Sequence, residues 1–201
     1  MESAKYVQER VGDYITLYTG RHFYPLQPRK EDITVVDIAH SLSRLARYGG
    51  HLEDFYSVGE HSVYCYEIAK QLNLTPLQQM YTLMHDASES IVNDVVTPLK
   101  QHMPLYKDIE HNVMNVIWDM IGVPHPTEED YEQVKLIDST LLVNEMNQLG
   151  KRQDTPNVSH HDTIKVDFSK KRTMKETKEA FLEAYNQLED VLGLGANRTA
   201  I

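Results

Sequence analysis

Hydrophobic periodicity is the feature that most constrains the fold of this chain. From residue 32 onward, apolar side chains recur at spacings of three and four residues, which is the period of an α-helix that buries one face. The segments that carry such stripes are 32–47, 61–72, 75–85, 104–122, 127–145 and 173–193. The predicted fold class is therefore all-α, a bundle of helices.

Several of these segments also carry start and stop signals. Thr75 followed by Pro76 is typical of an N-cap with proline at the first helical position. Thr173 with Glu176 has the spacing of a capping box. Glycine follows the predicted end of three helices, at Gly49, Gly122 and Gly193. These signals fix where most of the helices should begin and end.

Two segments depart from the helical pattern. Near the amino terminus, residues 14–18 and 22–26 flank Thr19-Gly20, and this arrangement predicts a short β-hairpin. Residues 151–172 lose the helical period, and Thr163 to Phe168 alternates as a strand would. We expect a loop or a small β element there.

Length and composition set outer limits. A chain of 201 residues suits one domain, 1–201, that buries roughly 70% of its unfolded surface. Cys65 is the only cysteine, so no internal disulfide can form. The sequence has no apolar stretch typical of a signal peptide or a membrane span, so we expect a cytoplasmic protein that does not enter a membrane. A net charge of −10 argues against binding to long nucleic acid.

Four polar residues fall on or beside the predicted buried stripes. His61 and His85 lie on the apolar faces of two helices, with Asp86 next to His85, and Asp138 lies on the stripe of a third. Each alone is more often a core histidine or an ion-pair residue. A buried ionised carboxylate costs several kcal/mol unless it is paired, and one divalent metal ion would satisfy all four groups. The metal-site core then spans about 32–150.

The ligand types narrow the choice of metal, and the neighbouring acids suggest a reaction. Mixed imidazole and carboxylate ligands favour Co, Mn, Zn or Fe over Mg or Ca. Open positions on such an ion would acidify a water molecule and polarise a phosphoryl oxygen. Glu89, on the same predicted helix as His85, would orient or deprotonate that water. Asp94 would act as acid or base or would hold a substrate hydroxyl. His111 is the best rival ligand.

The order of these residues resembles the HD-domain metal-dependent phosphohydrolases, whose signature is a histidine, a His-Asp pair and a distant aspartate. Residues 85–100 are similar to bacterial 5′-deoxynucleotidases of this superfamily. Residues 19–62 are similar to small phage and bacterial members, including phage dATP triphosphohydrolases. The resemblance implies an HD-domain helical bundle with His61, His85, Asp86 and Asp138 on the metal. It assigns catalysis to Glu89 and Asp94.

The same resemblance implies a deoxynucleotide substrate. Arg47-Tyr48 stands where the deoxynucleotidases have an Arg-Trp pair that binds phosphate and crowds out a 2′-hydroxyl. Arginine can bind a phosphate bidentately, and a ring beside C2′ would exclude ribose. Lys100 is expected to reach a phosphate and His51 to line the pocket. A second ion, Mg, would sit on the phosphates.

The expected activity is hydrolysis of a dNTP, with dATP as the example, to deoxynucleoside and triphosphate. One alternative is a 5′-deoxynucleotidase that acts on a dNMP, and another is a metal-containing nucleotide sensor without activity. A cyclic-nucleotide or (p)ppGpp hydrolase would need extra histidines or regulatory modules, which are not evident. The resemblance also implies a homo-oligomer, a dimer or a hexamer, in the cytoplasm of a bacterium or of the host of a phage.

Overall fold

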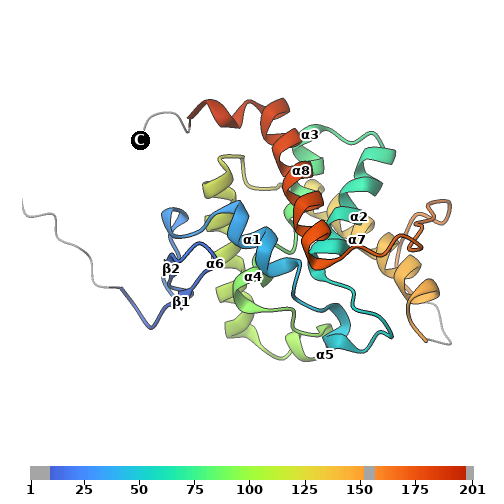
Figure 1. The fold of residues 1–201 in the computed structure, drawn as a ribbon, viewed down its shortest axis with the longest axis horizontal. Coiled ribbons are helices and arrows are strands. Elements are labelled where there is room, and N and C mark those ends of the chain that lie inside the picture. The colour runs from blue at the N-terminus through green and yellow to red at the C-terminus, as the bar shows by residue number, and fades with distance from the viewer. Residues whose placement is uncertain (1–9, 152–156, 198–201) are drawn as a thin grey trace, which may run out of the picture.

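The computed structural model describes residues 10–151 and 157–197 and is mostly helical (Figure 1). The predicted domain 1–201 and the predicted loop 151–172 both include residues outside these ranges. The short elements are β1 (Ile15–Thr16), β2 (His22–Phe23), and the 3-10 helices η1 (Lys30–Asp32), η2 (Arg47–Gly50) and η3 (Leu194–Asn197). The α-helices are α1 (Val35–Leu42), α2 (Val58–Gln71), α3 (Pro76–Met84), α4 (Glu89–Val92), α5 (Thr97–Lys100), α6 (Pro104–Ile121), α7 (Glu128–Gln148) and α8 (Met174–Leu192).

The all-α prediction and the amino-terminal hairpin are confirmed. Strands β1 and β2 pair antiparallel, with Ile15 opposite Phe23, and Gly20 in the connecting turn has a φ of +85°. The predicted caps are also in place. Thr75 and Thr173 each accept a hydrogen bond from the backbone N–H three residues later, and each completes a capping box. Helix α6 ends at Gly122 in the left-handed region, as its sequence predicts.

The helix predicted at 32–47 is shorter than expected, because α1 ends at Leu42. Backbone pairing draws the following residues away from the helix axis: Val58 donates to the carbonyl of Leu45, and Arg47 donates to that of Tyr56. This crossing brings Gly59 of α2 so close to α1 that a Cβ there would lie 2.9 Å from the backbone nitrogen of Ser43. The early stop places Arg47 beside α2 rather than on α1.

The described part of the 151–172 segment is a loop, not a strand. The alternation still marks what is buried, since Ile164, Val166 and Phe168 are each only 9% exposed. Amide side chains of α7 take the place of a partner strand. Asn144 donates to the carbonyl of Ile164 (3.1 Å) and accepts from the N–H of Val166 (3.1 Å). Side chains of one helix thus satisfy the backbone of an extended segment.

Helix α2 runs through the middle of the molecule. Helix α8 covers α1, α2 and α3, while α7 packs against α2 and α3 (Figure 1). The larger apolar cluster joins the hairpin to α1, α3, α6 and α8, and the smaller one joins α2 to α7 and the 164–168 segment. The meeting point of α2, α3 and α7 is where polar side chains enter the interior.

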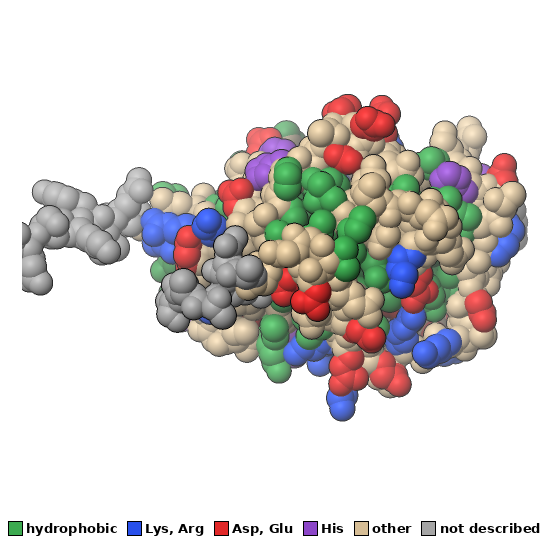
Figure 2. Space-filling view, turned by 90° about the horizontal axis from the view of Figure 1, so that it is seen from above, with side chains coloured by type: hydrophobic (Ala, Val, Ile, Leu, Met, Phe, Trp, Pro, Cys, Tyr) green, Lys and Arg blue, Asp and Glu red, His purple; other side chains and the backbone are tan. Residues whose placement is uncertain are grey.

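On the surface, acidic and basic side chains are interspersed across the face drawn in Figure 2. Among the described residues, no helix combines the length and the hydropathy that a membrane span requires.

Candidate metal centre

Two histidines face each other across α2 and α3, and each is oriented by a partner on Nδ1. His61 Nδ1 lies 2.6 Å from Oε1 of Glu145, and His85 Nδ1 lies 2.8 Å from the carbonyl oxygen of Thr82. Because both partners are acceptors, each Nδ1 must carry its proton. Nε2 of each ring is therefore the atom left to face the site, the arrangement that orients metal-binding imidazoles.

Two aspartates approach these Nε2 atoms. Asp138 Oδ1 lies 3.1 Å from Nε2 of His61, and Asp86 Oδ2 lies 3.2 Å from Nε2 of His85 and 3.9 Å from that of His61. Ligands bound to one ion at about 2.1 Å are roughly 3.0–3.5 Å from each other. The four residues that the sequence singled out thus lie close together, with two of the three nitrogen–oxygen distances inside this range and the third at 3.9 Å.

A buried orphan atom supports the same interpretation. Nε2 of His85 is inaccessible to solvent and makes no hydrogen bond, although Asp86 lies near it. A buried polar atom without a partner is costly, and this one points into a ring of potential ligands. A metal ion would satisfy it.

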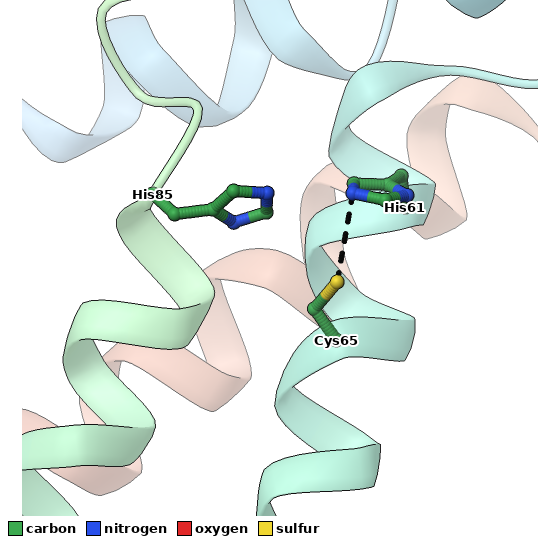
Figure 3. Close-up of side chains that lie close together, drawn as sticks. All are labelled: His61, Cys65 and His85. Carbon is green, nitrogen blue, oxygen red and sulfur yellow. Dashed lines mark hydrogen bonds between the residues drawn. The ribbon is translucent and has the colours of Figure 1, made fainter. Parts of the chain in front are cut away.

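A thiol belongs to the same group of donors. Cys65 is completely buried one helical turn after His61, and its Sγ lies 3.5 Å from Nε2 of His61. Potential ligand atoms of Cys65, His61 and His85 all lie within 4.8 Å of one another. Figure 3 shows the ring of His85 reaching from α3 toward the pair on α2. The described residues therefore hold a buried His61–Cys65–His85 group that can bind a metal ion.

Charge in the centre is set by its carboxylates. Burial opposes ionisation of Asp86, but His85, His61 and Arg47 outweigh burial and hold its pKa well below the usual value. The pKa of Asp138 is lowered in the same way, chiefly through its hydrogen bond with His61. Burial and Arg47 alone would lower the pKa of His61, yet the surrounding negative groups raise it. In the metal-free protein a proton on His61 supplies positive charge that a metal ion would replace.

Glu145 is a central residue of the site that the sequence interpretation did not assign. It is completely buried on α7 and accepts hydrogen bonds from Nδ1 of His61, from the hydroxyl of Tyr56 (2.7 Å) and from the hydroxyl of Tyr48. Arg47 Nε lies 3.7 Å away. Although burial opposes it, Arg47 and His61 lower the pKa of Glu145 to about 2. Glu145 is an ionised anchor that fixes His61 and Tyr48 together.

The centre opens into a pocket of about 510 Å³. Its lining includes the predicted ligands Asp86 and Asp138, the predicted catalytic residues Glu89 and Asp94, and the predicted substrate-binding residues Arg47, Tyr48 and Lys100. The volume is within the usual range for small-molecule sites. The structure thus gathers most of the predicted site residues around one opening.

Glu89 lies on this pocket by a different route from the one expected. Helix α3 ends at Met84, and a tight turn over residues 85–88 separates it from α4, whose first residue is Glu89. In that turn the N–H of Glu89 donates to the carbonyl of Asp86 (3.0 Å). The prediction that Glu89 continues the helix of His85 is wrong, because hydrogen bonds over three residues replace the helical spacing of four.

Protonation of Glu89 follows from its surroundings. Burial, together with the negative charges of Asp86 and Asp94, raises the pKa of Glu89 to about 10. Its Oε2 is buried and makes no hydrogen bond. Burial also raises the pKa of Asp94. Without a cation beside Asp86, Glu89 therefore carries a proton at neutral pH.

Asp138 is more exposed than the periodicity of α7 predicts. Its side chain is 38% exposed, while the neighbouring Ile137 and Leu141 are fully buried. Asp138 lies at the edge of the apolar stripe and faces the pocket instead of the core. A second, largely aromatic pocket that includes Tyr81, Trp118 and Tyr131 also reaches Asp138.

Arg47 and Tyr48 sit at the wall of the pocket, and Tyr48 has an unusual backbone conformation. Arg47 Nη1 is 3.4 Å from Asp86 Oδ2, and Nη2 is 4.0 Å from Asp138 Oδ1. Tyr48 has a φ of +57°, which costs roughly 1 kcal/mol for a residue other than glycine. Its bond to Glu145 offsets that cost and holds the ring against the site.

The remaining predicted residues differ in position. Lys100 lines the pocket, with Nζ 2.5 Å from Glu110 Oε1. His51 is exposed and is not among the residues that line this pocket, because the turn after Arg47 directs it to the surface. His111, the rival ligand, is exposed on α6.

Comparison with known proteins gives a family without a described activity. No family model matches the sequence. The chain is 38% identical over 138 residues to the uncharacterized protein YfdR of Escherichia coli K12, covering 68% of this chain and 72% of YfdR. It is 36% identical over 113 residues to an uncharacterized protein of Rhodobacter capsulatus, covering 54% of this chain and 58% of that protein. The protein therefore belongs to the same family as YfdR.

Proposed function

We propose that this protein is a metal-dependent deoxynucleotide phosphohydrolase of the HD type. The observation that carries the proposal is that two aspartates approach the Nε2 atoms of two histidines, each with its Nδ1 anchored, beside a pocket that both aspartates line. His61, His85, Asp86 and Asp138 would hold the ion. Co, Mn, Zn or Fe would suit this mixed set of nitrogen and oxygen ligands.

The bound ion would supply an acidified water molecule and a polarised phosphoryl oxygen. Glu89 is placed to hold and deprotonate that water. A cation beside Asp86 would cancel part of the negative charge that raises the pKa of Glu89 and would restore it as a base. Asp94, on the same pocket wall, would pass a proton to the leaving oxygen.

The substrate class follows from the two cations of the pocket. Arg47 lies next to both aspartates, where its guanidinium can also bind a phosphate on the ion. Lys100, farther along the wall, would bind a more distant phosphate, and a second Mg would assist it. The presence of two cations, with the resemblance over 19–62, favours a dNTP, hydrolysed to deoxynucleoside and triphosphate. The resemblance over 85–100 supports the alternative, a 5′-deoxynucleotidase.

Deoxyribose selectivity would rest on Tyr48. Its hydroxyl is bound to Glu145, so the ring edge is fixed and the ring cannot turn away from a 2′-hydroxyl. We expect dATP to be hydrolysed faster than ATP. Self-association as a dimer or hexamer is part of the same proposal, and elution volume would test it.

The test is a substrate panel on chelator-treated protein. dAMP, dATP, AMP and ATP are each incubated with added Mn, Co or Zn, and the products are separated by chromatography. Release of deoxyadenosine with triphosphate supports the leading proposal, and release only from dAMP supports the alternative. No nucleoside from any substrate would overturn both.

Two variants complete the experiment. Asp138→Ala should abolish both metal retention and turnover. Glu132→Ala, at an exposed position of the same helix, is the matched control and should leave both intact. Turnover retained in Asp138→Ala would remove Asp138 from the ligand set.

A further inference from the structure

Cys65 belongs to the smaller apolar cluster, but its sulfur lies beside a predicted metal ligand, His61. It lies on α2 one turn after His61, directly below the ring (Figure 3). We propose that the Cys65 thiol, as thiolate, is a further ligand of the same ion, which makes the centre selective for thiophilic metals. This inference rests on the metal centre of the proposed function and adds a ligand that the four-residue set lacks.

Distances support direct coordination. A metal bound to nitrogen at about 2.1 Å and to sulfur at about 2.3 Å keeps these two atoms roughly 3.1 Å apart in an octahedral arrangement and roughly 3.6 Å apart in a tetrahedral one. Sγ of Cys65 lies 3.5 Å from Nε2 of His61, between these two values. Asp138 Oδ1 lies 3.1 Å from the same Nε2, so an oxygen and a sulfur both approach this nitrogen.

The surroundings favour a ligand over a packing role. A buried thiol in an apolar site needs no polar partner, but the nearest polar atoms here are those of metal-binding side chains. His85 Nε2, the buried atom that lacks a partner, belongs to the same compact group as Cys65. One ion would thus bind both the nitrogen that lacks a partner and the sulfur that faces the same space.

Metal binding would release two protons to solvent. The S–H bond of Cys65 breaks as the sulfur–metal bond forms, and the proton on Nε2 of His61 leaves as the nitrogen–metal bond forms. Arg47, within 4.0 Å of oxygen atoms of Asp86, Asp138 and Glu145, offsets the added negative charge.

A sulfur ligand changes which metal the site prefers. Thiolate favours Zn, Fe(II) and Co over Mn and Mg, which prefer oxygen ligands. With five protein donors, a six-coordinate ion keeps one position, which the attacking water would take, and polarisation of the phosphoryl oxygen would then fall to Arg47. The centre would then hold one tightly bound thiophilic ion, and any Mg would be restricted to the substrate phosphates.

The decisive experiment adds Co(II) to the chelator-treated full-length protein and records the near-ultraviolet and visible spectrum. Because the chain has a single cysteine, an intense thiolate-to-cobalt charge-transfer band can come only from Cys65. We expect this band at one bound cobalt per chain. In Cys65→Ser the band should vanish while the weaker visible bands of cobalt remain. Cobalt and zinc affinity should fall about tenfold or more, with manganese affinity nearly unchanged.

The possible outcomes test the sulfur ligand and the metal centre separately. One cobalt bound without a charge-transfer band would overturn the sulfur ligand and leave the proposed function standing. No cobalt bound to the wild type would remove the metal centre itself, and equal binding to Asp138→Ala would remove Asp138 from the ligand set. Cys65→Ala provides a second variant if serine perturbs folding, and circular dichroism verifies the fold of each.

Discussion

The two His-Asp pairs of this chain are identical as dipeptides and differ in their surroundings. His85 and Asp86 lie at the end of α3, 12% and 19% exposed, within reach of His61 and Arg47. His161 and Asp162 lie in the loop before α8, where Asp162 is 87% exposed and pairs with Nε2 of His160. Asp86 of the first pair faces a pocket lined by charged side chains, whereas Asp162 of the second faces solvent, although Nε2 of His161 is buried. Neighbouring side chains, not the dipeptide itself, decide which pair lies close to other potential metal ligands.

The largest expected effect comes from making the same change in both pairs. Asp86→Asn keeps the shape and removes the charge of a predicted ligand, so bound metal should be lost and turnover should fall by more than about 100-fold. Asp162→Asn should change neither. Metal content of the purified variants, with turnover, checks both. Equal behaviour of the two variants would mean that the surroundings do not distinguish the pairs.

The effect of the surroundings on the first pair can also be tested at Glu145, which contacts the predicted ligand His61 but is not itself a predicted ligand. Glu145→Gln keeps the volume but loses the charge that holds the proton on Nδ1 of His61. We expect metal affinity to fall about 10- to 100-fold, as when other outer partners of metal ligands are changed. Tyr56→Phe removes one donor to the same carboxylate and is the milder control. Metal affinity is measured by competition with a chelator, and unchanged affinity in Glu145→Gln would contradict the role of Glu145.

How far the sequence predicts this site depends on the kind of residue. The cost of burying a charge drew attention to Asp138, yet Asp138 is 38% exposed, whereas Glu145 is fully buried on the same helix. Glu145 falls on the same stripe seven residues later, so the same physical argument could have found it. Its partners could not be found in this way, because Tyr48 and Tyr56 reach it through the crossing of distant segments.

In the fold, too, some features could be predicted from the sequence and others could not. Caps are local, so Thr75 and Thr173 mark their helices correctly from sequence alone. The early end of α1 depends on backbone pairing between residues 45–47 and 56–58, which no local pattern records. The turn at 85–88 places Glu89 on a new helix for a different reason, local hydrogen bonds over three residues. Periodicity in apolar residues therefore fails both at long-range backbone pairing and at tight turns.

The stability of the metal-free protein in acid should reveal that Glu145 is ionised in the folded state. Its pKa falls from 4.5 to about 2 on folding, so its ionised form stabilises the fold above pH 4.5 and loses that effect as the pH falls toward 2. The shift corresponds to about 3 kcal/mol. Urea unfolding at several pH values should show the difference in stability between wild type and Glu145→Gln shrinking across this window. A constant difference would mean that Glu145 is not ionised in the fold.

The smallest effect should come from the loop that carries the second pair. Asn144 is 4% exposed and bonds to the backbone of both Ile164 and Val166, so Asn144→Ala leaves two buried backbone groups without partners. We expect a loss of about 2 kcal/mol in the free energy of unfolding, measured in urea. Bound metal and turnover should stay at wild-type levels, because His161 and Asp162 belong to this loop and not to the centre. Loss of metal from a folded Asn144→Ala protein would show that the loop supports the site through α7, and the two pairs would then be coupled.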